Sequence, residues 1–138
     1  NAQAIELNEV VDYSGLPQLY KTNDKVDFSK GKKIVAYLSY GCPHCESAAH
    51  KLAFLQTKYH IDNLYVVFGS KHEENIQVFL ETTKIDFPMM WFDDEEFFQY
   101  SGPKIPTFVY LEDGVLKKKW TGEFFKVEEL EKVLSVED

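Results

Sequence analysis

Cysteine is scarce in this chain, and long apolar runs are absent. Only two of the 138 residues are cysteines, and they stand close together at Cys42 and Cys45. This excludes a framework of several structural disulfides, and the pair itself is compatible with either an oxidising or a reducing compartment. No apolar run reaches the roughly 20 residues that a membrane-spanning helix needs. The chain begins at Asn1, and we therefore expect a processed or trimmed form; a removed secretory signal or membrane anchor is compatible with this start.

Positive charge is also in short supply. Lysine and arginine together number 15 against 23 carboxylates, which gives a net charge of −8. An acidic chain without a basic stripe is not expected to bind nucleic acid. Lysines 117–119 are interpreted as a solvated strand edge. No repeat, low-complexity segment or linker interrupts the sequence, and its length suits a single domain.

The stretch around the two cysteines changes its periodicity. Residues 34–40 form an apolar run with β-branched and aromatic members, which predicts a buried strand closed by Gly41. From Cys42 onward, apolar residues recur at steps of three and four, which predicts a helix. Pro43 is typical of a first helical turn, because the amide that it lacks would be unpaired there.

That placement gives the cysteines a chemical role. Cys42 is expected at the helix N-terminus, where free N–H groups and the helix dipole favour a thiolate, the nucleophilic form of cysteine. Cys45 lies one turn further on the same face, so the two sulfurs can close a disulfide. A protonated His44 between them would stabilise the Cys42 thiolate and make the disulfide more oxidising.

Three other interpretations of the pair remain open at this point. A structural disulfide would close only a very short loop and would stabilise the fold little. A zinc site would need a second pair of ligands, and His50, His60 and His72 are scattered. Two inert buried thiols are the third interpretation. The strand, Cys-x-x-Cys and helix in succession favour redox chemistry over all three.

The rest of the chain alternates strands and helices. A second buried strand is predicted at 64–68, a helix at about 71–84, a short apolar segment at 87–92, and a helix that starts in the acidic run 93–96. A strand at 105–111 follows, then a turn at 112–114, a partner strand at 115–122 and an amphipathic helix at 126–136. Residues 1–30 predict an N-terminal strand or short hairpin at the sheet edge.

This order resembles the thioredoxin superfamily over about residues 26–136. Cys42-Pro43-His44-Cys45 after a strand is similar to the active site of DsbA-type disulfide oxidases, and the short body is similar to TlpA/ResA-type thioredoxins. Lys104-Ile105-Pro106-Thr107-Phe108 resembles the segment that carries the family's cis-proline. The resemblance implies a three-layer α/β/α sandwich with a mixed sheet and an extra β-α element before that proline. Residues 31–138 would form the thioredoxin-like domain, with 1–30 as its extension.

The resemblance also implies residue roles and an activity. Cys42 would be the nucleophile and Cys45 the resolving thiol of a thiol-disulfide oxidoreductase, with Pro43 and His44 tuning the pair. The backbone of Ile105 beside Pro106 would bind an extended substrate peptide. No cofactor or metal is required, because the two sulfurs carry the electrons. The expected partners are protein thiols or disulfides and a recycling protein in the membrane, and the expected location of this monomer is extracytoplasmic, as in the bacterial periplasm.

Two positions depart from the family pattern. Many members have a buried acid six residues before the first cysteine, where this chain has Ala36, so the proton route for Cys45 is unassigned. Gly41 replaces the usual aromatic residue before the first cysteine. The direction of electron flow is open as well. The alternative functions are a peptide-binding or chaperone module, whose aromatic residues around 91–100 would contact the peptide, and delivery of a soft metal ion such as Cu(I).

Overall fold

The sheet is mixed, and its parallel half leads into the cysteine pair. The structure is a computed structural model that describes residues 5–13, 26–69, 72–122 and 126–135. Its strands are β1 (Lys32–Leu38), β2 (Leu64–Phe68), β3 (Met89–Trp91), β4 (Thr107–Glu112) and β5 (Val115–Thr121). They stand in the order β3-β2-β1-β4-β5. β1, β2 and β3 are parallel, whereas β4 and β5 run antiparallel to their neighbours. The strands predicted from residue 34 onward are therefore present, with β5 at an edge as expected.

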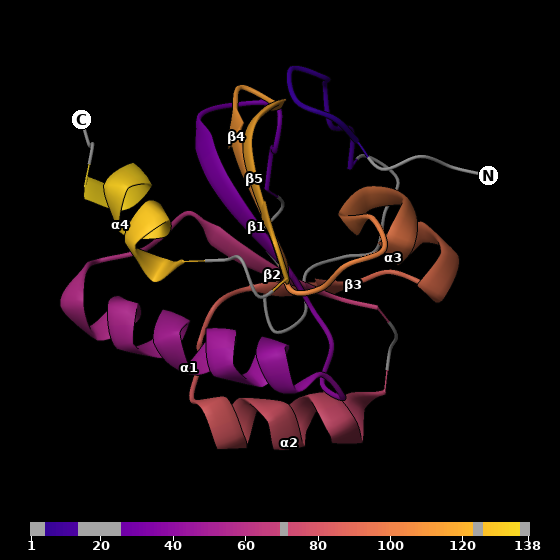
Figure 1. Ribbon diagram of the computed structural model, residues 1–138, viewed down its shortest axis with the longest axis vertical. Helices are drawn as coiled ribbons and strands as arrows, with labels where there is room; N and C mark the ends of the chain where they lie inside the picture. The colour runs from indigo at the N-terminus through magenta and orange to yellow at the C-terminus, as the bar shows by residue number, and fades with distance from the viewer. Residues whose placement is uncertain (1–4, 14–25, 70–71, 123–125, 136–138) are drawn as a thin grey trace.

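Helices cover both faces of this sheet (Figure 1). They are α1 (Pro43–Lys58), α2 (Glu73–Thr83), α3 (Asp94–Ser101) and α4 (Val127–Ser135). α1, α2 and α4 pack on one face and α3 on the other. α2 begins two residues later than predicted, with His72 as its N-cap, while β1 begins two residues earlier and β4 two residues later than predicted. The architecture is thus an α/β fold with a five-stranded mixed sheet between helices.

The alternation of β1 divides its side chains between two buried clusters. Ile34, Ala36 and Leu38 face α1, α2 and α4, together with Cys45. Val35 and Tyr37 face α3 and the N-terminal segment. β1 is central and buried on both faces, and a continuous apolar run is what such a strand requires.

The N-terminal segment lies against the second of these faces. Within the described residues 5–13, its pairing with the sheet is one isolated antiparallel bridge from Val10 to Val115 at the β5 edge. The strand or hairpin predicted for residues 1–30 is therefore reduced to a bridge here, and residues 14–25 lie outside the described part. Tyr13 anchors the segment, because its hydroxyl forms a short hydrogen bond with that of Tyr37 in a buried aromatic cluster.

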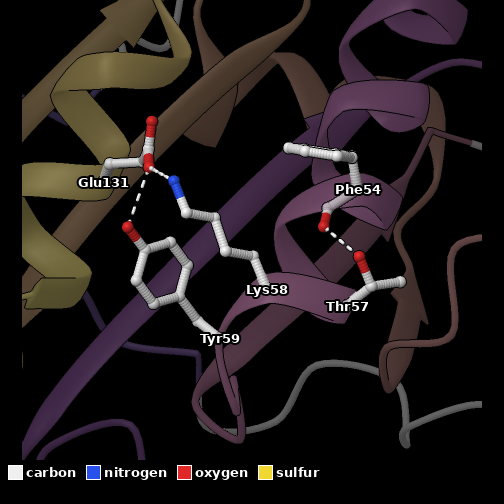
Figure 2. A network of polar contacts seen from close by, with 5 residues as sticks. All are labelled: Phe54, Thr57, Lys58, Tyr59 and Glu131. Carbon is white, nitrogen blue, oxygen red and sulfur yellow. Dashed lines mark hydrogen bonds and ion pairs between the residues drawn. The ribbon is translucent and has the colours of Figure 1, made fainter.

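A polar contact joins the end of α1 to α4 (Figure 2). The hydroxyl of Tyr59 donates to a carboxylate oxygen of Glu131 at 2.8 Å, and Lys58 Nζ reaches the same oxygen at 3.1 Å. Leu130, beside Glu131, is fully buried against the face that holds Cys45. The terminal helix is therefore held over the helix that carries the cysteines by this polar contact and by the apolar side chains of Leu130 and Val133.

Candidate active site at the carboxyl ends of the parallel strands

The cysteine pair lies where the parallel strands end. In register, Leu38 pairs with Phe68 and Phe68 with Trp91, so the segments after β1, β2 and β3 emerge at one edge of the sheet. β4 enters from the same edge, since Thr107 pairs with Tyr37. This topology brings residues 39–42 and 104–106 together although they are far apart in the sequence.

Cys42 is the N-cap of α1, as the sequence predicts. It is in an extended conformation, and Pro43 occupies the first turn. Its sulfur accepts a hydrogen bond from the backbone N–H of Cys45 at 3.2 Å. The Cys42 side chain is half-buried, so it can be reached from outside. The free N–H groups and positive dipole end of α1 therefore point at an accessible sulfur.

Cys45 is the inaccessible member of the pair, with an exposed fraction of 0%. Burial raises the pKa of its thiol well above the usual range, and the hydrogen bond with Cys42 adds to this. A backbone hydrogen bond from Ser39 opposes the shift and lowers the pKa. The two sulfurs thus differ sharply, with one at the surface and one held protonated in the core.

No buried carboxyl group lies near Cys45 among the described residues. Ala36, at the position of the family's buried acid, has an exposed fraction of 0% and belongs to the same buried cluster. The buried polar side chains of the described residues are those of Thr83, Ser101 and Thr107, and none of them is acidic. Glu46 is exposed on the helix surface. Deprotonation of Cys45 therefore has no carboxylate base in its buried cluster.

The Ile105–Pro106 peptide bond is cis, as the resemblance implies. The carbonyl oxygen of Ile105 lies 4.0 Å from the Cys42 sulfur, at the limit of a sulfur hydrogen bond. Two hydrogen bonds fix this segment, from Thr107 Oγ1 to the Lys104 carbonyl at 2.5 Å and from the Gly122 N–H to the Pro106 carbonyl at 2.6 Å. The backbone at Ile105 is therefore held next to the accessible sulfur.

The other predicted site residues lie on the rim. Pro43 and His44 are exposed in the first turn of α1. Gly41 is exposed, and a Cβ atom placed there would meet nothing within 4 Å. The space that an aromatic residue would take before the first cysteine is therefore open in this chain.

Of the aromatic residues beside the cysteines, Tyr40 was not singled out from the sequence, and Trp91 was considered only for the peptide-binding alternative. The Tyr40 ring lies 6.3 Å from Phe68 and 6.2 Å from His72, edge to face with the histidine. Tyr40 and Trp91 are half-buried and pack on the same cluster as Cys42. The only signal available was their place directly after a strand or before a cysteine. Of the aromatic residues proposed to line a peptide site, Phe97 belongs to the core, with an exposed fraction of 1%.

Other kinds of site find little support in the described ranges. No three His, Cys, Asp or Glu side chains there are grouped as a metal ion would need. No helix of the described residues is both long and apolar enough to cross a membrane.

The sequence matches no protein-family profile and no curated protein. The structure, in contrast, is similar to several solved ones. One is the thioredoxin domain of a thiol-disulfide oxidoreductase from Bacteroides vulgatus, with a TM-score of 0.73 at 16% identity, covering 95% of this chain and 99% of that one. Another is a secreted disulfide oxidoreductase of Mycobacterium tuberculosis, homologous to E. coli DsbE, with a TM-score of 0.65 at 14% identity and coverages of 78% and 82%. StoA from Bacillus subtilis gives a TM-score of 0.59 at 21% identity, with coverages of 74% and 81%. These similarities identify the fold as that of thioredoxin.

Proposed function

We propose that this chain is a thiol-disulfide oxidoreductase that exchanges electrons with protein thiols and disulfides through Cys42 and Cys45. The observation that carries the proposal is the asymmetry of the pair on this fold. Cys42 is accessible at the N-terminus of α1, and Cys45 is buried one turn away with its N–H on the Cys42 sulfur. Solved structures with the same fold include proteins described as thiol-disulfide oxidoreductases, which supports the same chemistry here.

The proposed reaction has two exchange steps. The Cys42 thiolate attacks one sulfur of a substrate disulfide, whose S–S bond breaks as a Cys42–substrate disulfide forms. The departing substrate thiolate takes a proton from solvent. Cys45 then loses its proton and attacks the Cys42 sulfur, which forms the Cys42–Cys45 disulfide and releases the second substrate thiolate. Two electrons pass from the enzyme to the substrate, and the reverse sequence oxidises a substrate dithiol.

Ile105 is proposed to hold the substrate during the first step. Its carbonyl oxygen lies 4.0 Å from the attacking sulfur, close enough for a peptide that pairs with this backbone to bring its own sulfur to Cys42. Backbone pairing of this kind adds a short strand and depends little on the substrate sequence. Ile105 and Pro106 are therefore assigned to substrate binding, and Cys42, Cys45, Pro43 and His44 to the redox centre.

The finer assignment is to the TlpA/ResA type. The presence of α2, β3 and α3 between β2 and the cis-proline supports an extra α/β element of that type. Similarity to a secreted protein supports an extracytoplasmic location and a membrane-bound recycling partner. A single domain that works as a monomer is part of the same proposal.

The first test is the reduction potential of the Cys42–Cys45 couple, measured by equilibration with glutathione buffers. A value near about −120 mV would assign the protein to substrate oxidation, and one near about −270 mV to substrate reduction. A couple that stays oxidised far below about −300 mV would behave as a structural disulfide and would refute the proposal.

A second test separates exchange from binding. The Cys42→Ser, Cys45→Ser double variant should lose all reductase and oxidase activity on a protein disulfide substrate. A peptide-binding module would keep its full peptide-binding or chaperone activity without the sulfurs. Retention of that activity by the double variant would therefore favour the binding alternative.

A further inference from the structure

The three helices that start around the cysteine pair all begin with acidic side chains. Because β1, β2 and β3 are parallel and in register, α1, α2 and α3 each begin at the edge of the sheet where Cys42 lies, and their starts gather on one side in Figure 1. The residues concerned are Glu46 in α1, Glu73 and Glu74 in α2, and Asp93, Asp94, Glu95 and Glu96 at the start of α3. We call this set the acidic rim.

Contacts tie the rim to the redox centre. The N-cap of α2, His72, packs edge to face on Tyr40, two residues before Cys42. Phe97, in the first turns of α3, packs on Tyr37 near the end of β1 with ring centroids 5.8 Å apart. Two of the acidic helix starts are thus anchored to β1 or to the loop that leads into Cys42.

Cations are few at this edge of the described structure. Lys104 is exposed beside Ile105, and His44 and His72 are the other basic side chains described here. Lys32 lies at the start of β1, Lys58 at the end of α1 and Lys84 at the end of α2, which is the opposite edge of the sheet. Among the described residues, the edge with Cys42 thus has seven carboxylates against one lysine, whereas the opposite edge mixes lysines with carboxylates such as Asp62, Asp86 and Glu112.

We propose that the acidic rim selects polypeptides that carry lysine or arginine near the reacting cysteine. The half-buried Tyr40 and Trp91 and the Ile105 backbone leave a largely uncharged centre for the peptide, and the rim lies along the β2 and β3 side of it. A field of one sign around a reactive group raises the rate at which oppositely charged partners arrive and depresses the rate for like-charged ones. This inference rests on the proposed exchange activity and adds its substrate class.

The test compares three synthetic peptides that contain the same disulfide, flanked on both sides by lysine, serine or glutamate. The rate constant for reduction by the dithiol protein is measured by acid quenching and mass spectrometry. At low ionic strength the lysine peptide should react about tenfold faster than the serine peptide, and the glutamate peptide more slowly than both. At about 1 M salt, where the screening length falls to about 3 Å, the three rates should converge.

Two matched variants separate the rim from net charge alone. The first variant removes four charges from the rim and should lose most of the preference for the lysine peptide. Its substitutions are Glu73→Gln, Glu74→Gln, Asp94→Asn and Glu95→Gln. The second variant changes the net charge equally, at exposed positions away from the site, and should keep the preference for the lysine peptide. Its substitutions are Asp62→Asn, Glu81→Gln, Asp86→Asn and Glu112→Gln. Equal loss in both variants would overturn the inference.

The wild-type comparison decides the inference even if a variant folds poorly. Equal rates for the lysine and glutamate peptides at low salt would overturn the charge selection while leaving the exchange activity in place. Failure of all three peptides to exchange in either direction, as disulfides with the dithiol protein or as dithiols with its disulfide form, would overturn the proposed function itself, and the selection with it.

Discussion

The backbone N–H of Cys45 donates to the sulfur of Cys42 over 3.2 Å, while the Cys45 sulfur itself is fully buried. One residue therefore serves two purposes at the same time. Its amide stabilises negative charge on the Cys42 sulfur, which is the outer one. Its thiol lies in an apolar environment where ionisation is unfavourable. Exchange chemistry of the proposed kind needs this division, because the outer sulfur must react first and the inner one second.

The first prediction concerns the alkylation of the reduced protein. Iodoacetamide at neutral pH should modify Cys42 at least about tenfold faster than Cys45, because Cys45 is inaccessible and each unit by which a pKa rises lowers the thiolate fraction tenfold. Peptide mapping by mass spectrometry gives both rates. In denaturant the two cysteines should react at similar rates, and similar rates in the folded protein would contradict the asymmetry.

The second prediction is a loss of stability at alkaline pH. The folded-state pKa of Cys45 is above its unfolded value of about 8.5, so its contribution to stability is complete below that pH. As the pH rises above about 8.5, the unfolded state loses the proton first, and the free energy of unfolding should fall by at most about 1.4 kcal/mol per pH unit.

Many other groups titrate in that range, so the experiment compares two variants. Cys42→Ser and Cys42→Ser, Cys45→Ala differ only at Cys45, and urea unfolding of each is followed from pH 7 to about pH 10. The difference between their free energies should be constant up to about pH 8.5 and then decrease. A difference that does not change with pH would show that the pKa of Cys45 is not raised.

The parts of the fold that the sequence predicted are those with a strong local signal. β2 was predicted at its observed bounds because an apolar run ends at a glycine, and the start of α3 because Asp93 is a capping residue followed by carboxylates. The start of α2 was missed because His72 forms no side-chain cap that a sequence pattern would reveal.

The parts of the site that depend on one local motif were predicted. The parts that depend on packing between distant segments were missed. Cys42 at the N-cap followed from the change in periodicity and from Pro43. The contact between Tyr40 and His72 joins two loops, and periodicity describes only single elements, so nothing local announces it. The hydrogen bond between Tyr13 and Tyr37 was missed for the same reason, because it joins two segments that are distant in the sequence.

The third prediction addresses the missing acid at Ala36. Ala36→Asp should speed the release of substrate from the Cys42–substrate disulfide on the order of tenfold, short of the roughly hundredfold or more that a well-positioned base contributes. The reason is that Ala36 shares a buried cluster with Cys45, in which none of the described residues is acidic. Stopped-flow measurement of the second exchange step provides the rate.

Ala36→Asn is the control for this substitution. It has nearly the same shape but cannot accept a proton, so it should leave the release rate unchanged. It should still lower stability by roughly 1–3 kcal/mol, because it buries a polar group without a designed partner. A faster release in the asparagine variant would mean that altered packing, and not proton transfer, causes the effect.

The last prediction uses the asymmetry between losing one partner of a buried hydrogen bond and losing both. Tyr37→Phe should lower the free energy of unfolding by about 1–3 kcal/mol, because it leaves the Tyr13 hydroxyl buried without the partner that it has now. Tyr13→Phe, Tyr37→Phe removes both hydroxyls and keeps the rings that pack with Phe28 and Phe97, so it should regain most of that loss. Urea unfolding of the two single variants and the double variant measures the coupling. Because these rings lie on the face opposite Cys45, the reduction potential of the cysteine couple should be the same in all three. Additive losses in the double variant would show that the two hydroxyls do not depend on one another.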